Sequence, residues 1–319
     1  MTDLTTYKLN HSMIRVKDPK ASLEFYSHLG LSVLQEFHLP QHRQDLFFLA
    51  FGASSPGSGD SPASISHGTL PSDREGVLEL SYNYGIERTH NGNTEPKGFS
   101  HLCISVDNID TACKSLAQNG YTFQKHFDPQ DGHAVVLDPD EYWIMIIPQY
   151  RNPQDAEVTT ADTQTYRFNH TMLRVKDKET SIRFYQEVCG MTLKHTFHNH
   201  NAGYDSYYLG YGLKATIAHG LYPNGREHEG LLGLTWYYGT EKQDGLVYHG
   251  GNTEPEGFGH ICISVDDTGL ACERLEQYGV SWVKRLKDGP FRIAFLTDPD
   301  GYLIEIIQNE RFKPPGHEF

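Results

Sequence analysis

Hydrophobic and polar positions alternate with two different periods in the first part of the chain. Apolar residues within 13–16 have the spacing of a short strand, and those within 23–29 recur at helical spacing up to Gly30. Short apolar runs at 46–52 and 76–85 follow, again with strand character. The period of the apolar positions therefore predicts the order strand, helix, strand, strand.

The same plan returns further along. A strand pattern at 101–106 precedes a helix pattern at 110–120, and two strand patterns follow at 133–139 and 142–148. We interpret each set as part of a unit of β-α-β-β-β form, which then occurs twice within 150 residues. Because each helix has one apolar face to cover, we expect an α+β fold of curled mixed sheets with helices packed outside.

The chain also repeats itself at long range. NHSMIRVKDP at 10–19 returns as NHTMLRVKDK at 169–178, and GNTEPKGFSHLCISV at 92–106 returns as GNTEPEGFGHICISV at 251–265. We therefore expect two homologous halves and four β-α-β-β-β modules. The expected boundaries are a first half at 1–150 with modules at about 7–90 and 95–148, a polar linker at 151–165, and a second half at 166–319 with modules at about 166–245 and 255–309. The Ser/Pro/Gly-rich segment 53–73 interrupts the plan, and we interpret it as a surface insertion without a core.

Composition narrows the classes of function. The chain has 319 residues, 38% of them hydrophobic, and a net charge of −14, so binding of a polyanion such as DNA is disfavoured. Its five cysteines include no C-x-x-C pair, which favours reduced thiols and means that a metal would use His and carboxylate ligands. No run approaches ~18 apolar residues and the start lacks a signal-peptide pattern, so we expect a cytoplasmic protein without membrane contact.

Two glutamates lie in strand patterns that are otherwise apolar. Glu305 shares a strand face with Leu303 and Ile307, and Glu79 lies between Leu78 and Leu80. A carboxylate buried there costs several kcal/mol unless it is paired or bound to a cation. Together with two histidines borne on strands, at positions that match between the repeats, these glutamates favour a shared metal site. Imidazole and carboxylate ligands suit zinc, nickel, cobalt or iron.

At this point the sequence resembles a known family. NHSMIRVKDP, LELSYNYG, HNGNTEPKGFSH and DPDGYLIEI are similar to motifs of glyoxalase I (lactoylglutathione lyase) in the vicinal oxygen chelate superfamily, in its double-length single-chain form. The resemblance implies metal sites built from both halves. One site is complete and consists of His11, Glu79, His260 and Glu305. The other, at His101, His170, Gly233 and Met145, lacks both carboxylates, so we expect one divalent metal per chain, zinc first, with nickel or cobalt as alternatives.

The resemblance also implies the chemistry. Glyoxalase I isomerises the hemithioacetal of methylglyoxal and glutathione to S-lactoylglutathione through an enediolate, and Glu305 corresponds to the base, with Glu79 as its partner. Arg15, Asn83 and Lys284 match residues that contact glutathione. Glu256 departs from the family pattern, because an Arg or Lys is expected there.

Two other functions stay open on the same scaffold: a metal-dependent dioxygenase, and a small-molecule binding protein without catalysis. The fourth ligand, Glu79, favours the glyoxalase over both. Because the linker joins the two halves, we expect a monomer.

Overall fold

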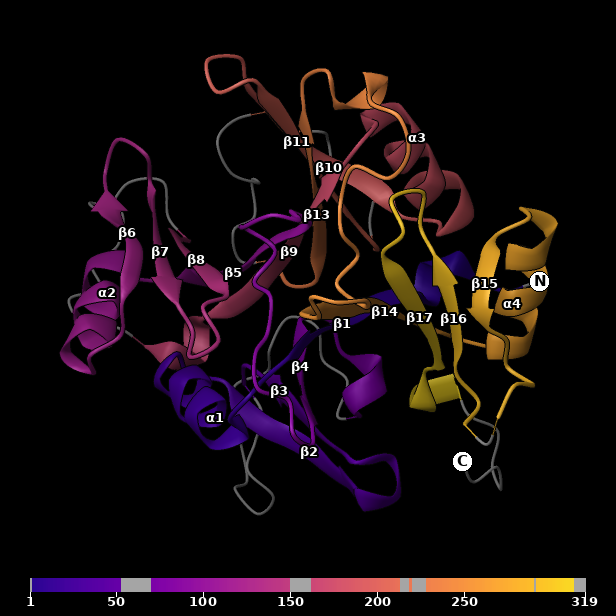
Figure 1. The fold of residues 1–319 in the computed structure, drawn as a ribbon, viewed down its shortest axis with the longest axis horizontal. Helices are drawn as coiled ribbons and strands as arrows, with labels where there is room; N and C mark the ends of the chain where they lie inside the picture. Colours follow the sequence, from indigo (N-terminus) through magenta and orange to yellow (C-terminus); the bar gives the residue numbers. More distant parts are fainter. Residues whose placement is uncertain are drawn as a thin grey trace.

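The computed structural model describes residues 2–52, 70–149, 162–212, 218–219, 228–289 and 291–312. Four modules follow one another in the expected order (Figure 1). The first contains β1 (Lys8–Arg15), α1 (Pro19–His28), β2 (Ser32–Leu39), β3 (Gln44–Ala50) and β4 (Val77–Asn83). The second contains β5 (Phe99–Val106), α2 (Ile109–Gln118), β6 (Phe123–Asp128), β7 (His133–Leu137) and β8 (Trp143–Pro148).

The second half repeats this order. The third module contains β9 (Arg167–Val175), α3 (Lys178–Arg183), β10 (Thr192–Asn199), β11 (Tyr204–Gly210), β12 (Ala218–His219) and β13 (Leu231–Tyr237). The fourth contains β14 (Phe258–Val265), α4 (Thr268–Gln277), β15 (Ser281–Lys284), β16 (Ala294–Thr297) and β17 (Leu303–Gln308). The α+β fold of four modules is confirmed.

The sheets combine modules from opposite halves. One sheet has the order β15-β16-β17-β14-β1-β4-β3-β2, so it joins the first and fourth modules. The other has the order β12-β10-β11-β13-β9-β5-β8-β7-β6 and joins the second and third. Antiparallel pairing of β1 with β14 and of β5 with β9 makes each junction, and Figure 1 shows indigo β1 beside orange β14. Each sheet therefore carries residues of both halves.

The same local signal starts all four helices. An Asp or Asn follows the strand and accepts backbone N–H bonds of the first helical turn, at Asp18, Asn108, Asp177 and Asp267. Such N-caps satisfy donors that have no partner within the helix. In the third module the helix continues as a π-helical turn, Phe184–Val188.

Buried tyrosines hold the two modules of each half together. Tyr26 on α1 donates to Asp138 of the second module at 2.9 Å, and Tyr185 donates to Asp298 of the fourth at 2.8 Å. All four side chains are buried. Each helix thereby fixes its own sheet against the neighbouring sheet.

Two expected boundaries need correction where the structure describes them. Residues 53–69 of the insertion lie outside the described residues, but Pro71–Asp73 form a 3₁₀ turn in which Ser72 and Asp73 are buried. Asp73 pairs with Lys8 at 3.0 Å and accepts from Asn309 at 2.9 Å. The prediction of a coreless insertion is therefore wrong for its last residues, because their polar side chains bond to Lys8 on β1 and to Asn309 and Glu310, which follow β17.

The linker is also anchored at its second end. Residues 151–161 lie outside the described residues, while Thr163–Thr165 form a 3₁₀ turn capped by Asp162. Thr163 lies against Gly30, where a Cβ would clash with its side chain. None of the described helices is long and apolar enough to cross a membrane.

Candidate functional site

Four side chains meet on one face of the first sheet. His11 on β1, Glu79 on β4, His260 on β14 and Glu305 on β17 come from four adjacent strands, and all four are buried. Their ligand atoms lie within 4.8 Å of one another. Within the described ranges, this is the one group of three or more His, Cys, Asp or Glu residues close enough to share a metal ion.

The strand register brings these residues together. Glu79 pairs with Met13 in the parallel ladder β1–β4, and Glu305 pairs with Cys262 in the parallel ladder β14–β17. Met13 in turn faces His260 across the junction of the two halves. Alternation along each strand then turns all four ligands to the same side of the sheet.

The distances are those of a ligand set around one ion. His11 Nε2 lies 3.1 Å from His260 Nε2, 2.9 Å from Glu79 Oε2 and 3.2 Å from Glu305 Oε2. Two imidazole nitrogens bound tetrahedrally at about 2.0–2.1 Å would be about 3.4 Å apart. The four residues therefore fit a divalent metal by donor type and by spacing.

Neighbouring side chains orient the histidines. His11 Nδ1 donates to Asn10 Oδ1 at 2.8 Å, which turns Nε2 toward the cluster, and Asn10 itself donates to the carbonyls of Pro71 and Arg74. Phe48 and Phe295 pack edge-on against His11 and His260, each with 5.4 Å between ring centroids. The sequence analysis missed Asn10, although the repeated Asn-His pair at 10–11 and 169–170 is a visible signal.

Opposite charges dominate the electrostatics. Burial opposes the charged imidazoles, but hydrogen bonds and charges of Glu305 and Glu79 outweigh it, so the pKa of His11 is raised and that of His260 is raised to about 9. Burial also opposes the two carboxylates, but their bonds to the histidines outweigh it and lower the pKa of Glu79 and of Glu305. The centre thus favours ionised carboxylates and a compensating positive charge, which a cation would supply in place of protons.

The predicted degenerate cluster lies on the matching face of the other sheet. His101 Nε2 and His170 Nε2 are 3.3 Å apart, both residues are buried, and their other nitrogens contact Ser100 Oγ at 3.0 Å and Asn169 Oδ1 at 2.8 Å. Gly233 and Met145 occupy the register positions that Glu79 and Glu305 occupy in the first sheet. Burial lowers the pKa of His170 to about 3, and burial together with His170 lowers that of His101.

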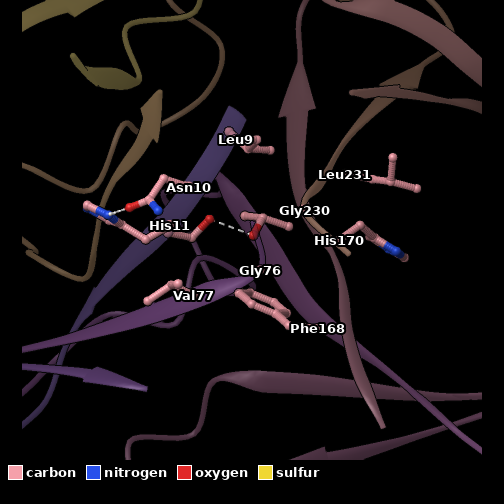
Figure 2. A pocket seen from close by; sticks show the side chains of 11 residues that line it. Leu9, Asn10, His11, Gly76, Val77, Phe168, His170, Gly230 and Leu231 are labelled. Atoms are coloured by element: carbon pink, nitrogen blue, oxygen red, sulfur yellow. Dashed lines mark hydrogen bonds between the residues drawn. The ribbon is translucent and has the colours of Figure 1, made fainter. Parts of the chain in front are cut away.

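A narrow crevice lies between the two clusters. Its lining includes strand residues of both halves, and Figure 2 shows the rings of His11 and His170 pointing away from each other on its opposite sides. Ser12 and Thr171 are joined beside it by a 2.7 Å hydrogen bond. The crevice is a packing gap between the sheets, and the metal-ligand atoms face the other way.

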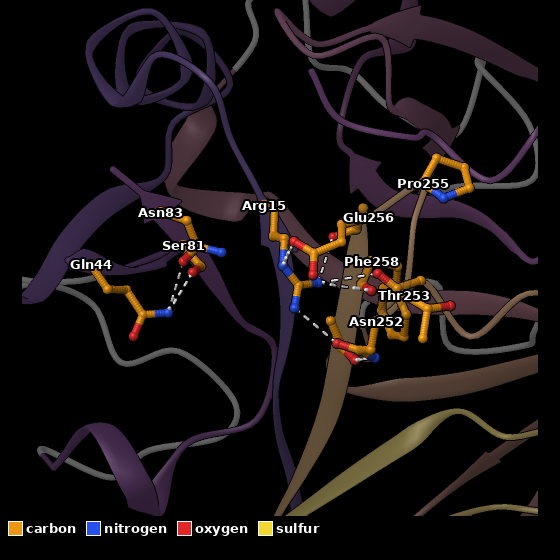
Figure 3. A network of polar contacts seen from close by, with 12 residues as sticks. Arg15, Gln44, Ser81, Asn83, Asn252, Thr253, Pro255, Glu256 and Phe258 are labelled. Atoms are coloured by element: carbon orange, nitrogen blue, oxygen red, sulfur yellow. Dashed lines mark hydrogen bonds and ion pairs between the residues drawn. The ribbon is translucent and has the colours of Figure 1, made fainter. Parts of the chain in front are cut away.

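Arg15 is held by a loop of the opposite half (Figure 3). Its guanidinium donates to the carbonyls of Gly251, Gly257 and Phe258 at 3.3–3.4 Å and to Asn252 Oδ1 at 3.0 Å. Glu256 Oε2 lies 3.5 Å from Arg15 Nε. Arg15 therefore lies next to a carboxylate. The sequence analysis noted that Glu256 departs from the family pattern but did not predict that it pairs with Arg15.

The other two predicted substrate contacts lie apart from this loop. Asn83 ends β4, where its Oδ1 accepts from Gln44 Nε2 at 3.3 Å (Figure 3). Lys284 ends β15, where its ammonium donates to the carbonyls of Phe291, at 3.0 Å, and Ile293. In the described structure, the side chains of Asn83 and Lys284 therefore bond to other groups of the protein. Contact of Asn83 and Lys284 with a substrate stays a prediction.

Comparison with known proteins places these features in context. A profile of the Glyoxalase/Bleomycin resistance protein/Dioxygenase superfamily matches residues 8–146 and 167–306. The chain is 42% identical over 320 residues to a lactoylglutathione lyase of Schizosaccharomyces pombe, covering 97% of this chain and 99% of the relative. It is 38% identical over 315 residues to glyoxalase I of Saccharomyces cerevisiae, covering 95% and 92%. The crystal structure of glyoxalase I from Zea mays shares the fold with a TM-score of 0.68 at 23% identity, covering 96% of this chain and 94% of that one.

Proposed function

Because this chain belongs to the lactoylglutathione lyase (glyoxalase I) family of enzymes, we propose that it isomerises the hemithioacetal of methylglyoxal and glutathione to S-lactoylglutathione at the centre formed by His11, Glu79, His260 and Glu305. The buried four-residue cluster is the observation that carries this proposal. The cluster of the other sheet, with Gly233 and Met145 in place of the glutamates, takes no part in the reaction.

His11, Glu79, His260 and Glu305 hold one divalent metal per chain. Zinc suits two imidazoles and two carboxylates in a closed, buried set, and nickel and cobalt are the alternatives. When bound, the metal supplies a Lewis acid that stabilises negative charge on the two substrate oxygens. Asn10 keeps the His11 ring in the orientation that this ligand role needs.

The glutamates move the proton. Isomerisation removes a proton from the carbon that bears sulfur and hydroxyl and delivers it to the neighbouring carbonyl carbon. Glu305 takes that proton, and Glu79 serves the opposite face. The two carboxylates come from the outer strands, β17 and β4, of the four-strand set, so they flank the histidines. Both carboxylates are ionised beside the histidines, which is the state from which a base accepts a proton.

Arg15, Asn83 and Lys284 bind the glutathione part of the substrate. The γ-glutamyl end of glutathione carries an ammonium group beside its carboxylate. Arg15 and Glu256 present one charge of each sign 3.5 Å apart, so this pair complements both groups. Glu256 stands where the family pattern has an Arg or Lys. In this chain it thus offers the substrate ammonium a carboxylate partner.

The chain acts as a monomer in the cytoplasm. Pairing of β1 with β14 and of β5 with β9 is made within one chain, which supports a monomer that sedimentation can test. The five cysteines form no disulfide, which supports a reducing compartment.

One assay tests the function and its alternatives. The metal-loaded protein is mixed with methylglyoxal and glutathione while thioester absorbance and dissolved oxygen are followed, and the run is repeated after removal of the metal by a chelator. We expect thioester to form only with metal, without oxygen uptake. Oxygen consumption with a catechol-type substrate would instead favour a dioxygenase, and absence of both reactions in the loaded protein would contradict an enzymatic role.

A further inference from the structure

The degenerate cluster keeps half of a metal site. His101 Nε2 and His170 Nε2 stand 3.3 Å apart, close to the 3.1 Å between His11 and His260. Ser100 and Asn169 contact the far nitrogens of the two rings, as Asn10 contacts His11. Burial lowers the pKa of both imidazoles and keeps them neutral, the form in which histidine binds metals.

The other half of the site has changed from oxygen to sulfur. Met145 on β8 pairs with Cys103 on β5, just as Glu305 pairs with Cys262. Met145 packs against buried Cys103 and is itself half-buried, which leaves a route from solvent. The register position that carries a carboxylate residue in the first sheet therefore carries a thioether residue in the second.

A second thioether fills the space of the other missing glutamate. Gly233 takes the place of Glu79, and a Cβ built on Gly233 would lie 2.8 Å from Met172 Sδ. The Thr235 hydroxyl donates to the same sulfur at 3.0 Å. Met172 is thus turned toward the position that the lost carboxylate would occupy, beside His170.

The matching methionine of the first sheet turns the opposite way. Met13 lies against Gly259, the residue before His260, where a Cβ would clash with the methionine side chain. The second sheet has Ser100 at that place, and its hydroxyl bonds to His101. The exchange of Gly for Ser closes the space used by Met13 and leaves the space over Gly233 for Met172. The sulfur position therefore follows from two linked sequence differences.

We propose that His101, His170, Met145 and Met172 form a binding site for a soft monovalent cation, Cu(I). Two imidazoles and two thioethers are ligands that favour Cu(I) over hard divalent ions. Loss of both carboxylates also removes the two negative charges that offset a divalent ion at the first centre, so an ion of lower charge is preferred. Cys103, buried beside Met145, keeps the surroundings of the site apolar and sulfur-rich.

Competitive titration tests this site. The enzyme, loaded with its divalent metal, is titrated anaerobically with Cu(I) against the chromophoric chelator bicinchoninate. To limit binding by accessible thiols, the half-buried Cys113 and Cys272 are first replaced by serine. We expect one Cu(I) per chain, with sulfur and nitrogen neighbours in X-ray absorption spectra and no release of the divalent metal.

Volume-conserving variants identify the ligands. Met145→Leu and Met172→Leu should each weaken Cu(I) binding by about tenfold or more, a loss that even an outer partner of a metal ligand can cause. Met191→Leu, which changes a buried methionine of the core, should leave Cu(I) binding unaltered. Equal Cu(I) binding by all three variants, or uptake only with displacement of the divalent ion, would overturn the proposal. Circular dichroism confirms that each variant is folded.

Discussion

The two centres show how two carboxylates set the character of a buried histidine pair. Both pairs are buried and have their Nε2 atoms 3.1 and 3.3 Å apart. Beside Glu79 and Glu305 the pKa of His260 rises to about 9, whereas burial without such partners lowers that of His170 to about 3. The scaffold therefore fixes where the imidazoles lie, and the residues at 79 and 305, or 233 and 145, decide the charge that surrounds them.

Arg15 and Arg174 occupy matching positions in the two sheets and make nearly the same hydrogen bonds. Arg174 donates to the carbonyls of Gly92, Gly98 and Phe99 and to Asn93, matching the contacts of Arg15. A contact present in both sheets cannot distinguish the active one, so these bonds hold the halves together. The difference is Glu256 beside Arg15.

The largest difference between the centres is expected in turnover. Glu305→Gln retains shape and an oxygen ligand but removes the base, so kcat should fall by about 10²–10⁴. His170→Ala in the other sheet should leave kcat nearly unchanged. Steady-state kinetics on metal-loaded variants measure both. The assignment fails if His170→Ala abolishes turnover while Glu305→Gln does not.

Rebuilding the missing ligands should remove the difference in metal content. The triple variant Ser100→Gly, Met145→Glu, Gly233→Glu gives Met172 the space that Met13 uses and restores both carboxylates. The divalent metal content, measured by metal analysis, should rise from one ion per chain to two. The double variant without Ser100→Gly serves as control and should bind the second ion more weakly, because Met172 competes for the space. A triple variant that still holds one ion would show that more than the ligands has been lost.

The buried His170 of the degenerate cluster should make the free energy of unfolding fall as the pH is lowered. The folded-state pKa of His170 lies below its unfolded value, so the unfolded chain binds the extra proton as pH falls below about 6.5 and stability is lost. From pH 7 to 5 this histidine should cost about 2 kcal/mol of unfolding free energy. Denaturant titrations of metal-free protein at pH 7 and pH 5 measure this loss of unfolding free energy. In the His170→Gln variant the loss should be smaller than in the unchanged protein by that amount. An identical pH dependence in both would mean that His170 takes up its proton in the folded state.

The smallest expected effect concerns substrate affinity. Arg15→Lys replaces a planar fork by a point charge and should raise KM about tenfold, the cost of one weakened charged hydrogen bond, with kcat less affected. Arg174→Lys is the matched control, since it loses the same loop contacts and should alter stability equally without changing KM. Equal KM values for the two variants would confine Arg15 to its structural bonds.

Much of this comparison was predictable because it depends on local rules. Strand alternation and the repeat offset gave the four modules and directed attention to Glu79 and Glu305, and the resemblance joined them with His11 and His260. The turn of Met172 toward Gly233 was not predictable, since it depends on which neighbour, Ser100 or Gly259, leaves space. The buried Asp73 was missed for a similar reason: its partners Lys8 and Asn309 are distant in sequence, and composition alone describes its segment as surface.

The division of each sheet between halves has a consequence for the order of synthesis. The second and third modules adjoin along the chain, so their shared sheet can assemble before the fourth module leaves the ribosome. By contrast, β1 emerges first and can pair with β4 of its own module, but its other edge waits for β14, since His11 and His260 are 249 positions apart in the sequence. Closing so long a loop is entropically costly, and an unpaired strand edge invites aggregation. The Ser12–Thr171 bond and the Lys8–Asp73 pair give β1 further partners that emerge before β14. The sheet that lacks the two glutamates would thus act as a template on which the sheet with His11, Glu79, His260 and Glu305 is completed.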